Sequence, residues 1–472
     1  MRLTRKQLLA GAGASALAGA GIYELVDQLS GGAPTRDAVA DGPLPPEQHV
    51  LLGVRTVRDN GVAVLVPPLH HQLVTLKLKA GSKHDLQTGQ VELEQALTSL
   101  EVDYAPTPAG LGVTVGWGLP YFLRYLPTYS ARYLPIDRRA SKAKGKPVRA
   151  LLDAVRFPSD PPQTILEQND AVILLRSDSL KAIADGAGRL VKDLDFWGVT
   201  SIRRGFAGGG FDGRQSLPKR MAMAANVGGA FLIPDRAELF LGFTSTQKAG
   251  LGPTRIANLE TLGYSDGGPG GYFRHGTSMH VSHIFEDLEG WYINFTHSQR
   301  VTTMFRPTVS VPSGTMTVRQ GPSDVATGRD NVGDYRRFRA IGHSASIQTT
   351  SRLLADTRGA DGTLYPKGTA IPHRADFNTL DNPFFFSADP GRDQMSDQPA
   401  AGLHFVVFNP TSDDFHRNRL AMDGVLPAGV KLPFDPKDRG QGFNSVLTTT
   451  HRQNFLVPPR VHRSFPLAEL LK

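Results

Sequence analysis

The order of strand-like and helix-like segments predicts an α+β protein of two tandem ferredoxin-like domains with long loops. From residue 50 onward, the segments run strand, helix, strand, strand, helix, strand, as one ferredoxin-like unit requires. Similar kinds of segment follow in a second round after residue 236, without any repeat of the sequence itself. The 50 glycines and 34 prolines indicate many turns and long connections rather than a helical bundle.

The first domain is expected over residues 48–235. Residues 70–81 alternate apolar and polar side chains, as a half-buried strand does. Residues 91–104 are expected to form a helix, because their apolar side chains fall on one stripe. Further predicted elements are strands at 110–122 and 171–177 and an amphipathic helix at 179–194.

The second domain is expected over residues 236–472. Its predicted elements are a short strand at 237–245, a strand passing into a helix at 276–292, the end of that helical part at 301–307, a buried strand at 401–410 and a helix at 413–424. Long loops are expected at 120–163, 306–340 and 353–370, and loops of this length are usually functional or partly mobile.

Residues 1–40 have the architecture of an export signal. A basic start precedes an apolar run rich in Ala and Gly, and Ala38-Val39-Ala40 offers a small-x-small cleavage site. The start resembles a twin-arginine signal with Lys6 in the second position, which leaves the Sec route or a retained anchor open. We therefore expect an exported protein (periplasm, cell envelope or extracellular) that contacts a membrane only through this signal. Residues 27–47 are expected to be a linker.

Composition excludes several classes of function. The chain has no cysteine, which rules out disulfides, thiolate-ligated haem, all-cysteine iron–sulfur clusters and thiol catalysis. The net charge of +8 is spread along the chain with no basic block beside an aromatic platform, so no nucleic-acid partner is expected. The sequence contains neither a GxSxG elbow nor HExxH, and the glycine-rich residues 205–213 lack the ending of a phosphate-binding loop. His280 and His283 have metal-ligand spacing, but they should diverge where a strand leads into a helix.

Residues 341–352, IGHSASIQTTSR, place His343 alone among small side chains. From the residues alone, His343 is either an ordinary core histidine or the single axial ligand of a haem iron. A haem peroxidase needs an axial imidazole on one face of the haem. On the other face it needs a group that moves a proton and a cation that stabilises the departing oxygen. Arg374 and Asn378 could supply that distal cation and donor.

Several stretches, taken in order, resemble the dye-decolourising peroxidase superfamily. GLGVTVGWGLPYF is similar to that family's glycine-rich strand and turn, and IGHSASIQ to the segment that bears its axial histidine. IPHRADFNTLD is similar to the segment that bears its distal arginine. The other similar stretches are NDAVILLRSDS, HGTSMHVSHIFEDLEGWY, AGLHFVVFNPTSDDF and NFLVPP. Together they extend over residues 50–465, which is more specific than any one motif.

The resemblance implies two tandem ferredoxin-like domains arranged like a dimeric α/β-barrel, with a b-type haem (iron protoporphyrin IX) held by the C-terminal half. His343 would bind the iron, and Arg374 and Phe405 would lie beside the haem. The activity would be reduction of hydrogen peroxide with oxidation of a small organic donor, in a protein that can associate as a homo-oligomer.

One departure from the family concerns its catalytic aspartate. Ser245 stands in the corresponding GxxDG-like position, GFTST, and a serine is a poor general base without an activating partner. A literal GGFDG with Asp212 occurs earlier in the chain, in a different context. The departure favours an alternative of the same fold: a catalytically weak or non-enzymatic protein that binds haem or serves iron acquisition.

Overall fold

The first half of the chain forms a four-stranded antiparallel sheet. Its strands are β3 (His70–Leu78), β4 (Gly112–Trp117), β6 (Ala171–Ser177) and β7 (Trp197–Phe206), in the order β7-β3-β6-β4. Helix α3 (Lys83–Asp103) connects β3 to β4, and α7 (Leu180–Ala187) connects β6 to β7. This connectivity is that of a ferredoxin-like unit, as predicted. The computed structural model describes residues 20–31, 43–208, 215–244, 256–318, 329–382, 398–439 and 441–471.

The second half repeats the same connectivity. Its strands are β8 (Thr277–Glu286), β12 (Phe377–Thr379), β13 (Gly402–Asn409) and β14 (Leu447–Val457), in the order β12-β13-β8-β14. The short strand β11 (His373–Arg374) also pairs with β13. Helices α9 (Leu288–Asn294), α10 (His297–Met304), α11 (Arg329–Phe338) and α12 (His343–Ser351) precede β11, and α13 (Ser412–Met422) connects β13 to β14. The predicted tandem α+β class is confirmed.

The two halves join edge to edge into one 10-stranded sheet that closes on itself. One seam pairs Asn378 of β12 with Phe206 of β7, and the other pairs Leu456 of β14 with Trp117 of β4. Buried apolar side chains from both halves fill the middle of the ring. Because side chains alternate along a strand, each strand sends one set of residues into the ring and the other set toward the helices.

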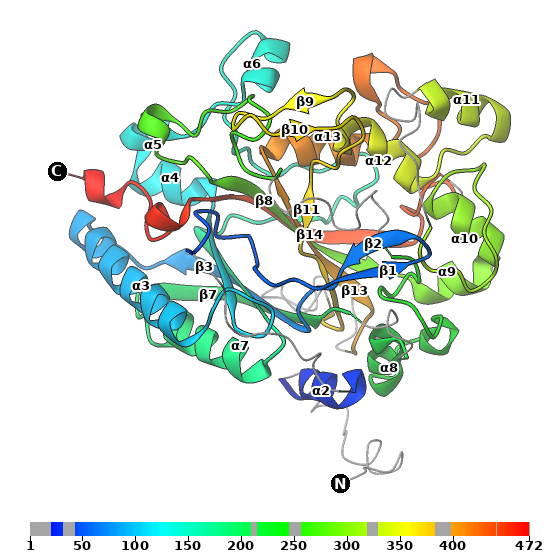
Figure 1. Cartoon of the computed structure of the whole chain (residues 1–472), viewed down its shortest axis with the longest axis horizontal. Coiled ribbons are helices and arrows are strands. Elements are labelled where there is room, and N and C mark those ends of the chain that lie inside the picture. Colours follow the sequence, from blue (N-terminus) through cyan, green and yellow to red (C-terminus); the bar gives the residue numbers. More distant parts are fainter. Residues whose placement is uncertain are drawn as a thin grey trace.

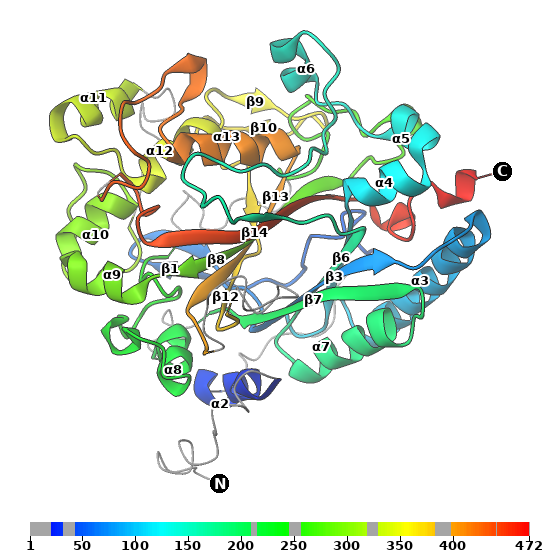
Figure 2. The same ribbon diagram turned by 180° about the vertical axis from the view of Figure 1, so that it is seen from behind.

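The helices lie outside the ring. Helices α3 and α7 lie together against β3 and β7, whereas α12 and α13 lie on the far side, over the second half (Figures 1 and 2). The remaining elements are short: strands β1 (Thr56–Asp59), β2 (Val62–Leu65), β5 (Ile165–Leu166), β9 (Thr357–Arg358) and β10 (Leu364–Tyr365), and helices α2 (Leu25–Ser30), α4 (Leu119–Tyr125), α5 (Pro127–Tyr133), α6 (Arg138–Lys144) and α8 (Leu217–Ala224).

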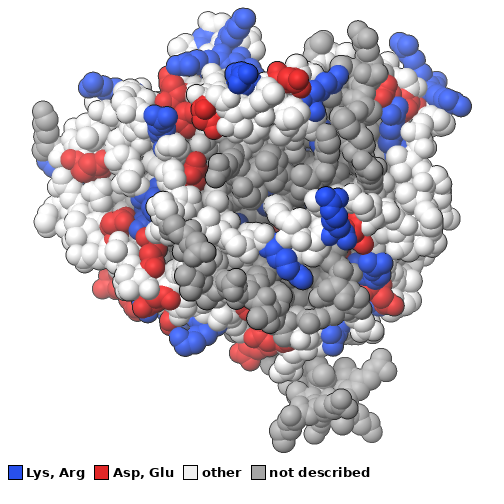
Figure 3. Space-filling model, in the orientation of Figure 1, with Lys and Arg blue, Asp and Glu red and all other residues white. Residues whose placement is uncertain are grey.

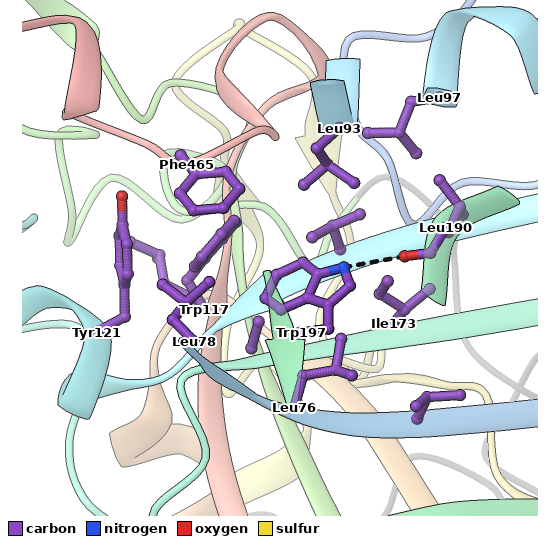
Figure 4. Close-up of a cluster of buried hydrophobic side chains, with 14 of the residues drawn as sticks. Leu76, Leu78, Leu93, Leu97, Trp117, Tyr121, Ile173, Leu190, Trp197 and Phe465 are labelled. Carbon is purple, nitrogen blue, oxygen red and sulfur yellow. Dashed lines mark hydrogen bonds between the residues drawn. The ribbon is translucent and has the colours of Figure 1, made fainter. Parts of the chain in front are cut away.

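An aromatic cluster anchors the core of the first half (Figure 4). Trp197 is 4% exposed, stacks on Phe465 at 5.9 Å and donates a 2.9 Å hydrogen bond from Nε1 to the Leu190 carbonyl. We expect Trp197→Ala to lower the free energy of unfolding by about 3–5 kcal/mol, because it leaves a large cavity. Urea titration of the variant measures this. Val102→Ala, at an exposed position of α3, should change the stability by less than about 0.5 kcal/mol. Equal losses in both variants would contradict the role of Trp197 in the core.

Several predicted boundaries were wrong. The expected loop at 120–163 contains α5 and α6, that at 306–340 contains most of α11, and that at 353–370 contains β9 and β10. The predicted strand at 237–245 is irregular over its described part, which ends at Thr244. Here the carbonyls of Phe240 and Leu241 accept hydrogen bonds from side chains, the Tyr292 hydroxyl and the Trp291 indole. Buried apolar residues therefore anchor this segment without a neighbouring strand.

Part of the predicted N-terminal linker is folded into the molecule. Helix α2 lies against α8 (Figure 1) and ends at Ser30, so residues 27–30 are helical. Val26 is fully buried, and the Tyr23 hydroxyl donates a 2.7 Å hydrogen bond to Asp381. The cleavage site predicted at residues 38–40 lies outside the described residues. Among the helices of the described ranges, none has the length and apolar character needed to span a membrane.

Candidate functional site

A largely apolar cavity of about 180 Å³ lies between the sheet of the second half and its covering helices. Side chains from β8, β13 and β14 form its floor, α12 and α13 form its roof, and residues of the segment 239–244 close one side. The cavity brings together three of the residues predicted from the sequence, namely His343, Arg374 and Phe405. Its other apolar lining residues include Leu241, Phe243, Met304, Phe305, Leu403, Phe415, Met422 and Phe443.

His343 is the first residue of α12, and its ring borders the cavity. The preceding Gly342 has φ 74°, and a Cβ atom there would lie 2.6 Å from the Phe305 carbonyl oxygen, so glycine is required. The imidazole packs 3.9 Å from the Phe443 ring. Its Nδ1 is buried and has no hydrogen-bond partner among the described residues. Burial, followed by the charges of Arg374 and Arg419, lowers the pKa of His343 to about 3, so the ring is neutral, the form that binds metals.

Arg374 lies on β11 and is held by a carboxylate. Its Nε donates to Asp376 Oδ1 at 2.8 Å and its Nη2 to Asp376 Oδ2 at 2.5 Å. Its guanidinium also lies 5.6 Å from the centre of the Phe405 ring. The two parallel hydrogen bonds fix the orientation of the guanidinium and compensate its charge.

Of the other two predicted site residues, Asn378 lies outside this cavity and Ser245 is not among the described residues. Asn378 is fully buried at the seam between the halves, where its Nδ2 donates to the Glu238 carbonyl at 3.1 Å and its Oδ1 accepts from the Phe240 amide at 3.3 Å. It lines a different, smaller cavity. Ser245 lies outside the described residues, as does Asp212.

Glu286, at the end of β8, is a cavity residue that the sequence analysis missed. Burial, reinforced by the nearby charge of Asp376, raises the pKa of Glu286 to about 8, so this carboxyl is mostly protonated at pH 7. Its Oε2 is buried without a partner among the described residues. The strand alternation was a usable signal, because Ser282, Ile284 and Glu286 fall on one face and all three line the cavity.

Arg452 of β14 also lines the cavity and was also missed. It is 1% exposed and donates one hydrogen bond, from Nη2 to Asp160 at 2.7 Å. Its Nε and Nη1 are buried and have no partner among the described residues. Burial lowers the pKa of Arg452 to about 10, which leaves it charged at neutral pH. Arg452 therefore places a buried positive charge with unpaired N–H groups beside the cavity.

In residue type, this lining fits a haem: one neutral imidazole, apolar walls and unpaired guanidinium donors for a propionate. In size, the enclosed part is smaller than a haem, because a cavity of about 150 Å³ holds only a benzene molecule. A four-ring haem would need the lining side chains to separate. His280 and His283 point to opposite faces of β8, and no group of three or more His, Asp or Glu among the described residues is placed to hold a metal ion.

The surface is mixed in charge. On the face shown in Figure 3, Lys and Arg side chains are interspersed with Asp and Glu, without a broad field of one sign over the described part.

The fold and the cavity define an α+β protein of two fused ferredoxin-like units with a buried pocket in its second half. The sequence model of a family of unknown function (DUF7405) matches residues 68–362, and the chain belongs to this family. Among curated proteins, none matches the chain.

Solved structures of similar fold include dye-decolourising peroxidases. DyPB from Rhodococcus jostii RHA1 is 13% identical with a TM-score of 0.46, over 85% of this chain and 96% of that one. The dye-decolorizing protein from V. cholerae is 12% identical with a TM-score of 0.46, over 85% and 97%. A putative DyP-type peroxidase from Shewanella oneidensis is 12% identical with a TM-score of 0.46, over 86% and 96%. At these values, the likeness says nothing about activity.

Proposed function

We propose that this protein binds haem b in the cavity under α12 and uses it as a peroxidase of low activity toward hydrogen peroxide and a small organic donor. One observation carries the proposal: the neutral imidazole of His343 borders an apolar cavity, and its Nδ1 is buried without a hydrogen bond among the described residues. Other buried histidines, such as His71 and His373, also have an unbonded Nδ1, but they do not line this cavity; the position of His343 beside the apolar cavity sets it apart. The ordered sequence resemblance supports the same role for His343.

Haem, when bound, supplies the iron that exchanges electrons with peroxide and donor. The residues of the chain have separate tasks. His343 would bind the iron, and the charged guanidinium of Arg452 would hold a propionate. The Arg374 guanidinium would stabilise negative charge that develops on peroxide. Glu286 holds a proton near neutral pH and is able to give or take it, because its pKa is about 8.

We expect Glu286→Gln to lower peroxide turnover about 100-fold with haem content unchanged, because general acid–base groups contribute at least about that factor. The measurement is the initial rate of phenol oxidation by the haem-loaded protein, normalised to its Soret absorbance. Glu238→Gln is a matched control, since burial also raises the pKa of Glu238 to about 8 but its side chain lines the smaller cavity. Equal activities in wild type, Glu286→Gln and Glu238→Gln would rule out the proton-transfer role.

A second candidate is a haem-binding protein with little or no peroxidase activity. Two observations favour it. Arg374 is held by Asp376 through two hydrogen bonds, and no described carboxylate contacts Nδ1 of His343. In haem peroxidases such a contact fixes the orientation of the axial histidine and raises its basicity. A haem-loaded protein whose peroxide turnover does not exceed that of free haem would select this candidate.

We propose that the chain is exported and that residues 20–31 remain part of the mature protein. Cleavage after Ala40 would remove Val26 from the core and break the hydrogen bonds of the Tyr23 hydroxyl. N-terminal sequencing of the protein recovered from the cell envelope or the medium is expected to give a start at or before residue 20. A mature protein that begins at Asp41 and unfolds at the same temperature as one that keeps residues 20–40 would overturn this proposal.

A further inference from the structure

A second cavity, of about 50 Å³, lies where β3, β6 and β11 meet the β1–β2 hairpin. Apolar residues of the segment 51–68 form one wall, and Arg176, His71 and His373 form the polar end. Arg374 borders this cavity as well as the candidate haem cavity. None of the functions proposed above uses the polar end of this cavity.

Arg176 is a buried cation without an acidic partner among the described residues. It is 4% exposed, and its one hydrogen bond to a described residue runs from Nη2 to the His49 carbonyl at 2.8 Å. Its Nε is buried and unbonded, and Arg176 forms no ion pair within the described ranges. Burial lowers the pKa of Arg176 to about 10, and no charge of a described residue offsets this effect. A buried charge is costly unless an opposite charge compensates it.

The histidines beside Arg176 do not compensate it. His71 faces Arg176 across the β3–β6 pair and is 3% exposed, and His373 is 6% exposed. Burial, with a contribution from Arg176, lowers the pKa of His71 well below its usual value and that of His373 to about 3. Both rings are therefore neutral. Nδ1 of each ring is buried without a partner among the described residues, which leaves further polar atoms unsatisfied around the guanidinium.

The two acidic side chains that line the cavity leave the charge of Arg176 uncompensated. Asp376 is bound by Arg374 through two hydrogen bonds. Glu238 is mostly protonated at pH 7, because burial raises its pKa to about 8. The described residues of the lining thus carry one net positive charge, at Arg176, together with an apolar wall.

We infer that this cavity is a binding site for a small aliphatic monocarboxylate, whose carboxylate meets the guanidinium of Arg176 and whose alkyl end meets the apolar wall. A planar guanidinium matches a carboxylate through paired hydrogen bonds. The cavity of about 50 Å³ is roughly a third of the ~150 Å³ that holds a benzene molecule, so the ligand is no larger than acetate. The inference does not depend on haem binding.

The test uses acetate, with acetamide as a neutral probe of the same shape. Saturation-transfer NMR with the full chain at pH 7 is expected to show saturable binding of acetate and none of acetamide. Arg176→Gln should weaken acetate binding roughly tenfold to a hundredfold, the effect of losing hydrogen bonds to a charged group. Arg352→Gln is the matched control: Arg352 is also buried with unpaired N–H groups and a pKa lowered to about 10, but it does not line this cavity.

Two further variants keep the test decisive if Arg176→Gln fails to fold. Arg176→Lys retains the charge and should retain weakened acetate binding. Ala207→Val leaves Arg176 in place but fills part of the cavity, and should abolish binding. The inference is overturned by no saturable acetate binding in the wild type, by equal binding of acetamide, or by an Ala207→Val protein that binds acetate as the wild type does.

Discussion

Replacing His343 with alanine is expected to abolish the Soret band of the haem-reconstituted protein. Haem affinity should fall by at least about 100-fold, because even the partners of a metal ligand are worth about 10–100-fold and the ligand itself more. His343 is the one histidine among the described residues that line the cavity, so none of these residues can replace it as the ligand. The measurement is a titration of the apoprotein with haemin, followed by the ultraviolet–visible spectrum.

His451→Ala is the matched control for this loss. His451 is also buried, and its pKa is likewise lowered to about 3 by burial, but its ring does not line the cavity. Any general destabilisation caused by removing a buried imidazole should appear in both variants, whereas loss of haem should appear only in His343→Ala. A Soret band that persists unchanged in His343→Ala would remove His343 as the ligand. The absence of a Soret band in the wild type would contradict the haem proposal, but it would not bear on the proposed acetate site.

The tandem ferredoxin-like order could be predicted because it rests on local patterns. The apolar runs of β6 and β13 and the amphipathic stretch of α7 are each visible within a few residues. The closure of the ring could not be predicted in this way. Each seam rests on one backbone pair between distant strands, such as Asn378 with Phe206, and no periodicity in the sequence encodes that pair.

Three residues of the candidate site could be predicted because they lie in segments that resemble family motifs. His343, Arg374 and Phe405 come from three separated segments and share one cavity. Asn378 was expected beside Arg374, four residues further along an extended chain. Instead, β11 ends at Arg374 and β12 begins at Phe377, so the chain bends between them and Asn378 turns to the seam. Its role as a distal donor stays a prediction without support from its position.

Acidification is expected to unfold the protein well above the pH at which carboxylates titrate. Burial lowers the pKa of three buried histidines far below the unfolded value of 6.5, namely His373 and His451 to about 3 and His404 to about 4. Below pH 6.5 these histidines bind protons in the unfolded chain but stay neutral in the folded chain. The stability that these three histidines contribute is therefore complete above pH 6.5 and is lost as the pH falls toward 3–4. Each histidine contributes a slope of about 1.4 kcal/mol per pH unit.

The three histidines together give a slope of roughly 4 kcal/mol per pH unit, against a typical total stability of 5–15 kcal/mol. Glu238 and Glu286 act in the opposite sense, since their raised pKa makes the folded state bind protons between about pH 4.5 and 8. Further buried histidines, among them His49 and His71, have lowered pKa values and add to the loss in acid. The histidines with lowered pKa values outnumber the carboxyls with raised pKa values, which also include Glu260 and Asp413, so the net stability falls on acidification below pH 6.5.

Urea unfolding at pH 7.5, 6.0 and 5.0 measures this dependence. His404→Gln should reduce the slope by about 1.4 kcal/mol per pH unit, because one proton fewer is taken up on unfolding. His84→Gln, which changes an exposed ring on α3, is the control and should leave the slope as it is. A free energy of unfolding that does not change between pH 7.5 and 5.0 would show that these imidazoles are not held neutral. The neutral His343 on which haem binding depends would then lose its physical basis too, because burial is the first cause of all these shifts.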